Sequence, residues 1–146
     1  MFLNLRLGRR KQMYKLEHIL IVDDDQINNL FSQIILEDAN ACSLVSICHS
    51  VTEALEFLRT SASSKDTPFP DLILLDISMP TLDGFDFLDR YHNAGYHEIH
   101  RTMISMFTSS DELHHIEKSR QYSSVVGFIK KPLSISSLNN ILELHC

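Results

Sequence analysis

Short aliphatic runs that end in polar residues recur along this 146-residue chain, and each is followed by a segment with helical spacing. The first run, Ile19 to Val22, stops at three aspartates, and another, Leu72 to Leu75, stops at Asp76. A continuous aliphatic run is typical of a parallel strand that is buried on both faces. Parallel strands need crossover connections, and the helices in those connections cover both faces of the sheet. The pattern therefore predicts a doubly wound α/β domain.

Five strands and five helices are expected in alternation. The strands are expected at 19–22, 44–48, 72–75, 103–107 and 125–129. The helices are expected at 27–40, 51–59, 85–93, 110–122 and 134–144. The first helix has apolar residues at positions 27, 30, 31, 34 and 35, which lie on one helical face. Ser50 to Glu53 has the sequence of a capping box, and Gly95 is expected to end the third helix.

Charge is distributed unevenly along the chain. Met1 to Lys15 contains five basic residues and no acidic one, whereas Leu16 to Cys146 contains 8 basic against 19 acidic residues, a formal charge of −11. Nucleic-acid binding depends on basic surface that displaces counterions, so the acidic body argues against it. We predict that residues 1–15 form a basic extension, either disordered or translated from a start codon upstream of Met13, and that residues 16–146 form the folded domain.

The sequence offers no feature of a membrane, secreted or zinc-binding protein. No apolar run approaches the roughly 20 residues that a membrane-spanning helix needs. The basic residues at 9–11 follow the first apolar residues, which is the reverse of a signal peptide. Three cysteines, Cys42, Cys48 and Cys146, contain no C-x-x-C pair, so neither a disulfide framework nor a zinc site is indicated. We expect a soluble cytoplasmic protein with reduced thiols and no membrane partner.

Polar residues whose side chains can bind ligands or take part in reactions stand where four of the expected strands end. They are the aspartates at 23–25, Asp76, Thr108 and Lys131. In a doubly wound sheet these ends share one edge, where ligands bind. Clustered carboxylates repel one another unless a cation holds them, and oxygen ligands with open positions suit Mg²⁺. A carboxylate can also accept a phosphoryl group covalently. The sequence therefore predicts a phosphoryl site that uses a divalent cation.

Four segments resemble, in order, the signatures of response-regulator receiver domains: Ile19–Asp25, Leu74–Gly84, Phe107–Ser109 and Phe128–Pro132. An Asp followed by Met-Pro and then Asp-Gly at this spacing is specific for that family. The resemblance implies a flavodoxin-like sheet with strand order 2-1-3-4-5. It also implies a stand-alone, chemotaxis-type signalling switch rather than an enzyme, whose own chemistry is limited to self-phosphorylation from small phosphodonors and autodephosphorylation.

The same resemblance assigns roles to the residues of the expected site. Asp76 is the phosphoacceptor for a sensor histidine kinase. Asp24, Asp76 and the backbone carbonyl of Ser78 bind Mg²⁺, and Asp23 acts on the ion through water. The partners implied are the kinase and either a downstream target protein or a phosphotransfer protein.

Three further residues carry the signal in the family. Lys131 pairs with Asp76 and then with its phosphate, Thr108 moves to bond a phosphoryl oxygen, and the ring of Phe128 rotates inward. The residues two beyond the acceptor and two beyond Thr108 tune dephosphorylation in the family, and here both are serines, Ser78 and Ser110.

Other interpretations of these residues are open at this stage. Asp23 to Ile27 also approximates the start of haloacid-dehalogenase-type phosphatases, in which Asp23 is the nucleophile. A degenerate receiver that acts only as a binding module is a third possibility, although every key position is filled. Asp25 could be a third metal ligand, but its position at a helix start favours an N-cap role. Asp83 and Gly84 are expected to form a turn before a helix.

Overall fold

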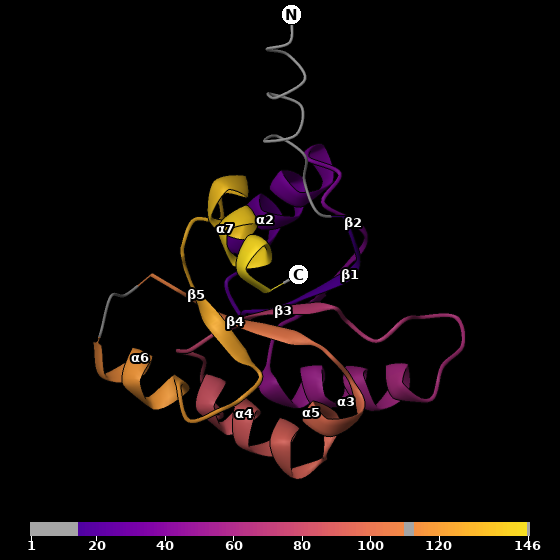
Figure 1. Cartoon of the computed structure of the whole chain (residues 1–146), viewed down its shortest axis with the longest axis vertical. Coiled ribbons are helices and arrows are strands. Elements are labelled where there is room, and N and C mark those ends of the chain that lie inside the picture. Colours follow the sequence, from indigo (N-terminus) through magenta and orange to yellow (C-terminus); the bar gives the residue numbers. More distant parts are fainter. Residues whose placement is uncertain (1–14, 110–112, 146) are drawn as a thin grey trace, which may run out of the picture.

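The computed structural model describes residues 15–109 and 113–145, which form a five-stranded parallel sheet between two layers of helices (Figure 1). The strand order is β2-β1-β3-β4-β5, so the predicted doubly wound, flavodoxin-like topology is confirmed. The strands are β1 (Leu16–Val22), β2 (Cys42–Cys48), β3 (Leu72–Asp76), β4 (Met103–Thr108) and β5 (Val125–Lys130).

Helices cover both faces of the sheet, with α2 and α7 on one side and the other helices on the opposite side (Figure 1). They are α2 (Gln26–Asp38), α3 (Val51–Ala62), α4 (Gly84–Asn93), α5 (Tyr96–Ile99), α6 (Leu113–Ser119) and α7 (Ile135–His145). The described chain thus has a sixth helix, α5, that was not predicted, because a single turn is too short to show a helical period. The expected start of the fourth helix at Ser110 lies outside the described residues, as does the basic extension up to residue 14.

The sheet separates two hydrophobic cores. Alternate residues of the central strands point to opposite faces, so that Leu20 and Ile73 pack under α3 and α4 while Ile21 and Leu74 pack under α2 and α7. All four side chains are fully buried. The continuous aliphatic runs therefore serve both layers at once and hold the carboxyl ends of the strands at one rigid edge.

Local capping fixes where the helices begin. The Ser50 hydroxyl accepts a hydrogen bond from the Glu53 amide at 3.1 Å, as the capping box predicts. The Glu53 carboxylate, however, accepts from the His49 amide, one residue before the N-cap. Asn40 has φ 53°, a left-handed conformation that asparagine tolerates, and it follows directly on the end of α2.

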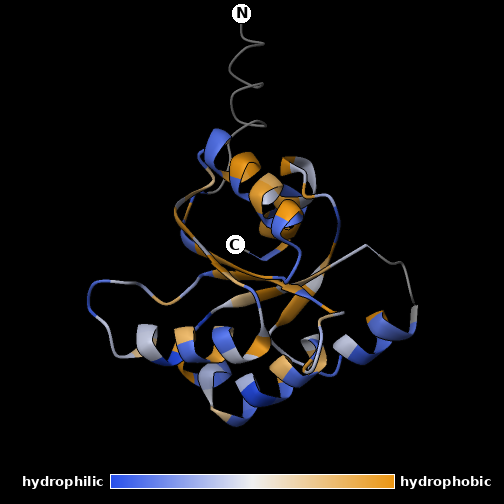
Figure 2. Ribbon diagram, turned by 180° about the vertical axis from the view of Figure 1, so that it is seen from behind, coloured by the Kyte–Doolittle hydropathy of each residue, from blue (hydrophilic) through white to orange (hydrophobic). Residues whose placement is uncertain are grey.

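The apolar face of α2 lies in solvent. Its members Ile27, Leu30, Phe31 and Ile34 are 82%, 60%, 44% and 47% exposed, and we call them the α2 apolar face. The side that α2 buries contains Asn29 and Ser32 together with Leu36. Hydrophobic residues also make up much of the two helices at the top of Figure 2. The helical periodicity in the sequence was correct, but the side that it marks is an accessible surface beside the carboxyl edge of the sheet.

Thr81, in the loop after β3, has φ 71°, and a β-branched residue is a genuine outlier in that region. We expect Thr81→Asn to stabilise the protein by about 1 kcal/mol, because asparagine tolerates the left-handed conformation at lower cost. In thermal unfolding followed by circular dichroism, the Tm should rise by roughly 3 °C. Thr67→Asn, in a loop where φ is negative, is the matched control. Equal Tm values for the two variants would contradict the inference that the backbone at Thr81 is strained.

Candidate functional site

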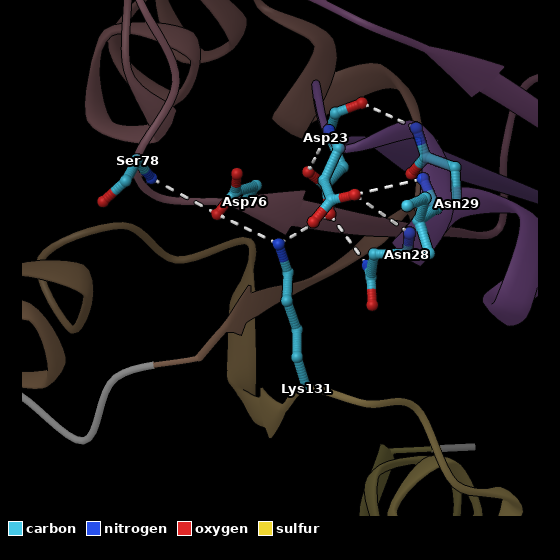
Figure 3. Close-up of polar contacts among 8 residues, drawn as sticks. Asp23, Asn28, Asn29, Asp76, Ser78 and Lys131 are labelled. Atoms are coloured by element: carbon cyan, nitrogen blue, oxygen red, sulfur yellow. Dashed lines mark hydrogen bonds and ion pairs between the residues drawn. The ribbon is translucent and has the colours of Figure 1, made fainter.

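Asp23 is the buried centre of the site and follows directly on β1. Its side chain is fully buried and accepts hydrogen bonds from the Asp25 amide at 3.0 Å and from the Asn28 side chain at 2.9 Å (Figure 3). The Asn29 side chain donates to the Asp23 carbonyl oxygen at 2.8 Å. The bonds from the Asp25 amide and Asn28 orient the carboxylate and stabilise its charge away from water, whereas the Asn29 bond holds the backbone at Asp23.

Asp76 ends β3, next to β1 in the sheet, and is 6% exposed. Its Oδ1 accepts a hydrogen bond from the Ser78 amide at 3.3 Å (Figure 3). Burial raises the pKa of Asp76 to about 6, and the neighbouring Asp23 carboxylate adds to the rise while Lys131 opposes it. A carboxylate with this pKa binds cations and protons more readily than an exposed aspartate does.

Lys131 joins the two aspartates. Its Nζ lies 2.6 Å from Asp23 Oδ2 and 3.5 Å from Asp76 Oδ1 (Figure 3). The expected contact with Asp76 is therefore present, but the shorter ion pair is with Asp23. The side chain is only 14% exposed, and its Nζ lies 5.4 Å from the ring centroid of the buried Phe107. The Lys131 amide donates to the Thr108 carbonyl oxygen at 2.8 Å, which anchors the lysine to the end of β4.

The loop after Asp76 packs closely on the start of α4. A Cβ on Gly84 would lie 2.7 Å from the Asp76 carbonyl oxygen and 3.0 Å from Ile77 Cα, so only glycine fits without movement of the backbone. The Gly84 amide donates to the Ile77 carbonyl oxygen at 2.9 Å. Asp83 caps α4 in a reciprocal capping box with Asp86, which confirms the turn that was expected at Asp83 and Gly84.

Three carboxylates are placed to share one cation. Ligand oxygens of Asp23, Asp24 and Asp76 lie within 4.8 Å of one another, and Asp24 is exposed, so that the cluster opens to solvent. The mutual repulsion that raises the pKa of Asp76 is the repulsion that a divalent ion relieves. Oxygen donors with open positions fit Mg²⁺. Asp25 is not a member of the cluster: its Oδ1 accepts from the amides of Ile27 and Asn28, and it caps α2 as expected.

Thr108 and Phe128, the two residues that were expected to carry the signal, lie on neighbouring strands. Thr108 ends β4 and is 7% exposed, beside Lys130 of β5. Phe128 lies on β5 and is half-buried against the core under α3 and α4. A cavity of about 350 Å³ is lined by Phe128 together with other residues of α6 and β5, Ile116 and Ser119 among them. Ser78 is exposed at the rim of the site, whereas Ser110 lies outside the described residues.

Two residues of the site were not predicted from the sequence, Asn28 and Asn29. Both lie in the first turns of α2: Asn28 donates to Asp23 Oδ2, the oxygen that also pairs with Lys131, and Asn29 donates to the Asp23 backbone carbonyl. Asn29 is 2% exposed, and its buried position on the inner side of α2 was masked by the stronger apolar periodicity on the outer side. A polar residue that recurs on the buried side of a helix next to clustered aspartates is the signal that could have revealed them.

Comparison with known sequences points to one family. A family model described as the response regulator receiver domain matches residues 19–143. A two-component response regulator of Arabidopsis thaliana is 26% identical over 131 residues, which cover 86% of this chain and 67% of that protein. The C4-dicarboxylate response regulator of Priestia megaterium is 22% identical, and the match spans 50% of its length.

Solved structures share the fold. The bacteriophytochrome response regulator AtBRR superposes with a TM-score of 0.72 at 26% identity, covering 89% of this chain and 92% of that one. A two-component response regulator from Cytophaga hutchinsonii has a TM-score of 0.81 at 22% identity, covering 89% of this chain and 96% of that one.

In the part of the chain that the structure describes, no helix has the length and apolar character needed to cross a membrane.

Proposed function

The chain belongs to the response regulator receiver domain family, and from this premise we propose that it is a phosphoacceptor switch in which a sensor histidine kinase phosphorylates Asp76. The observation that carries the proposal is the convergence of Asp23, Asp24, Asp76 and Lys131 at the carboxyl edge of the sheet. The proposal describes a signalling switch in the cytoplasm rather than an enzyme with a diffusible substrate.

In the proposed transfer, a carboxylate oxygen of Asp76 attacks the phosphorus of a phosphohistidine. The new O–P bond forms as the P–N bond breaks, and the imidazole leaves with the electron pair of that bond. Lys131 supports this step because its ammonium already lies against both Asp23 and Asp76, where it can neutralise added phosphoryl charge without much reorganisation. The Thr108 hydroxyl, at the end of the neighbouring strand β4, donates a hydrogen bond to a phosphoryl oxygen.

Mg²⁺ fits the carboxylate cluster and would be held by Asp24, Asp76 and the Ser78 carbonyl, with Asp23 acting through water. When bound, the ion neutralises negative charge on the phosphoryl oxygens. The residues of the chain orient the acceptor: Asn28 and Asn29 hold Asp23, Asp23 holds Lys131, and the Ser78 amide holds Asp76. These contacts support Asp76 as the acceptor because they hold its carboxylate at the carboxyl edge of the sheet, beside the exposed Asp24.

The signal is proposed to leave through the surface formed by α6, β5 and α7. Thr108 moves toward the phosphoryl group, and Phe128 rotates inward from its half-buried position, where a neighbouring cavity of about 350 Å³ gives the ring and the surrounding side chains room to rearrange. A local charge change would thereby shift the population of surface states that a partner reads. The partner is either a target protein or a phosphotransfer protein that receives the phosphoryl group on a histidine.

The α2 apolar face supports a protein as the phosphodonor. It lies next to the site, since α2 begins directly after the three aspartates, and it offers hydrophobic area of the kind that marks protein contacts. By contrast, no observation favours the phosphatase alternative. Asp23, its required nucleophile, is fully buried and already engaged by Lys131, Asn28 and the Asp25 amide.

Incubation with acetyl phosphate and Mg²⁺ tests the proposal, with intact-mass spectrometry as the readout. We expect one added phosphoryl group with Mg²⁺ and none with excess EDTA. Because the folded pKa of Asp76 is about 6, protons compete with the cation below that pH, so Mg²⁺ affinity measured by titration at pH 5 should be about tenfold weaker than at pH 8. Phosphorylation that is indifferent to EDTA, or Mg²⁺ affinity that is unchanged with pH, would contradict the assignment.

A further inference from the structure

The α2 apolar face is large, continuous and next to a hollow. A shallow, open depression of about 400 Å³ lies at its N-terminal end and is lined by Asp25, Ile27, Asn28, Phe31 and Pro132. Four large hydrophobic side chains in a row on one helix make a patch of the kind that soluble proteins cover with a partner. A segment or protein that binds this face should therefore present apolar groups to it.

The surroundings of the face are acidic. Between Asp23 and Ala41 the chain has five carboxylates and no lysine or arginine. Two of these, Glu37 and Asp38, lie in the last turn of α2, where they face the negative end of the helix dipole and cations are favoured instead. Within residues 15–109 and 113–145 neither carboxylate forms an ion pair. An occupant with basic residues at this end of the helix would stabilise it.

The N-terminal segment enters the domain at that same end. The Lys15 ammonium donates to Asn40 Oδ1 at 3.0 Å, and the Leu16 amide donates to the Ala41 carbonyl oxygen at 2.9 Å. Residues 1–14 are thus attached beside the C-terminal end of α2. Fourteen residues can span up to about 45 Å, whereas the 13 residues of α2 measure about 20 Å. The segment is long enough to lie along the whole face.

The sequence of the segment matches the face in both composition and order. Three residues, Gln12 to Tyr14, precede Lys15, and before them comes the basic run Arg9 to Lys11. Farther from the domain stand Phe2, Leu3, Leu5 and Leu7. The segment has no acidic residue. The basic run therefore lies between the point of attachment and the apolar run. In the same order along α2, Glu37 and Asp38 lie nearer the attachment than the exposed apolar side chains do.

We propose that residues 1–14 dock on the α2 apolar face of the same chain, with the basic run against the acidic end of α2 and the apolar run over Leu30 and its neighbours. Attachment through Lys15 makes the contact intramolecular, so that individually weak interactions act at a high effective concentration. One consequence rests on the proposed function: the docked segment restricts the approach of a protein phosphodonor to Asp76 and leaves small phosphodonors unaffected.

Photo-crosslinking in the full chain tests the contact. A benzophenone amino acid at position 4, within the apolar run, should crosslink to residues 26–38 when peptides are mapped by mass spectrometry. Leu30→Lys should reduce the crosslink yield about tenfold, because it replaces buried apolar area with a charge at the centre of the contact. Ile27→Lys should reduce the yield as well. Because this side chain is 82% exposed, the substitution should not disturb folding. Ile99→Lys, on the opposite helical layer and 72% exposed, is the matched control and should leave the yield unchanged.

Three outcomes would overturn the proposal. The first is crosslinking to segments other than α2, or an equal yield in the Leu30→Lys and Ile99→Lys chains. The second is crosslinking between chains in a mixture of isotopically light and heavy protein, which would assign the face to a second copy. The third is an N-terminus at Met13 in protein expressed from the native gene. Acetyl phosphate labelling of the same variants keeps the two proposals separate, since Leu30→Lys should still be phosphorylated.

Discussion

Replacement of Asp76 by asparagine is expected to abolish phosphorylation and, at the same time, to stabilise the metal-free protein at pH 8. The amide has no nucleophilic carboxylate oxygen, so acetyl phosphate with Mg²⁺ should add no phosphoryl group. The gain in stability follows from the burial of Asp76 and its repulsion by Asp23, which together raise its pKa to about 6. Asparagine keeps a similar shape and removes the charge.

The sign of the pH dependence can be derived from this shift. The pKa of Asp76 is about 6 in the folded protein and near 3.8 in the unfolded chain, so the stabilising contribution of the protonated form is complete below about pH 4 and is lost as the pH rises through 6. At pH 8 the ionised group lowers the free energy of unfolding by at most about 3 kcal/mol. Urea unfolding of both proteins at pH 5 and pH 8, with EDTA present, measures the difference.

Asp66→Asn is the control for this substitution, because Asp66 is an exposed aspartate in the loop after α3. That variant should be phosphorylated like the wild type and should show no added stability at pH 8. If Asp76→Asn were less stable than the wild type at pH 8, the electrostatic strain inferred for the site would be wrong. If it were still labelled by acetyl phosphate, the acceptor would lie elsewhere.

Replacement of Lys131 by methionine is expected to impair both transfer and stability. Methionine retains the apolar stem over Phe107 but leaves the buried Asp23 carboxylate without its ion pair. Removal of one partner of a buried pair usually costs about 3 kcal/mol or more, and the loss of a positive charge at the reacting group should slow phosphorylation about 100-fold. Unfolding in urea and the rate of phosphoryl incorporation from acetyl phosphate measure the two effects.

The loss of stability in Lys131→Met should be smaller at pH 5 than at pH 8, because a proton can then neutralise one of the two facing carboxylates. Lys65→Met, at an exposed lysine in the loop after α3, is the control and should leave both the stability and the rate of phosphorylation close to those of the wild type. A Lys131→Met protein with wild-type stability at both pH values would show that the 2.6 Å contact with Asp23 contributes little.

Most of the architecture could be predicted from the sequence because β1 and β3, which lie side by side within the sheet, contain uninterrupted aliphatic runs. Such runs, as in Leu72 to Leu75, are buried on both faces and have few other structures available to them. The site followed for the same reason: polar residues placed directly after those runs must meet at one edge. Asp76 and Lys131 were assigned in this way, and they do lie side by side.

Features that depend on tertiary packing could not be predicted. Periodicity marks a helical face but does not say whether the face lies inward, and in α2 the polar Asn29 is buried while Ile27 is exposed. The prediction for Lys131 was also incomplete, because a sequence contains no distances. It named only Asp76 as the partner, whereas Lys131 lies closer to Asp23 than to Asp76. The roles of Ser78, Thr108 and Phe128 in metal binding and signalling remain predictions, as does the domain boundary at residue 16.

The central claim is that Asp76 accepts the phosphoryl group, and the most direct test is to find the modified residue. After incubation with acetyl phosphate and Mg²⁺, the aspartyl phosphate can be reduced with borohydride to homoserine and located by mass spectrometry of peptides. The account predicts homoserine at position 76 and at no other aspartate. Homoserine at position 23 would contradict the assignment of Asp76 as the acceptor. So would an Asp76→Asn variant that is phosphorylated as well as the wild type.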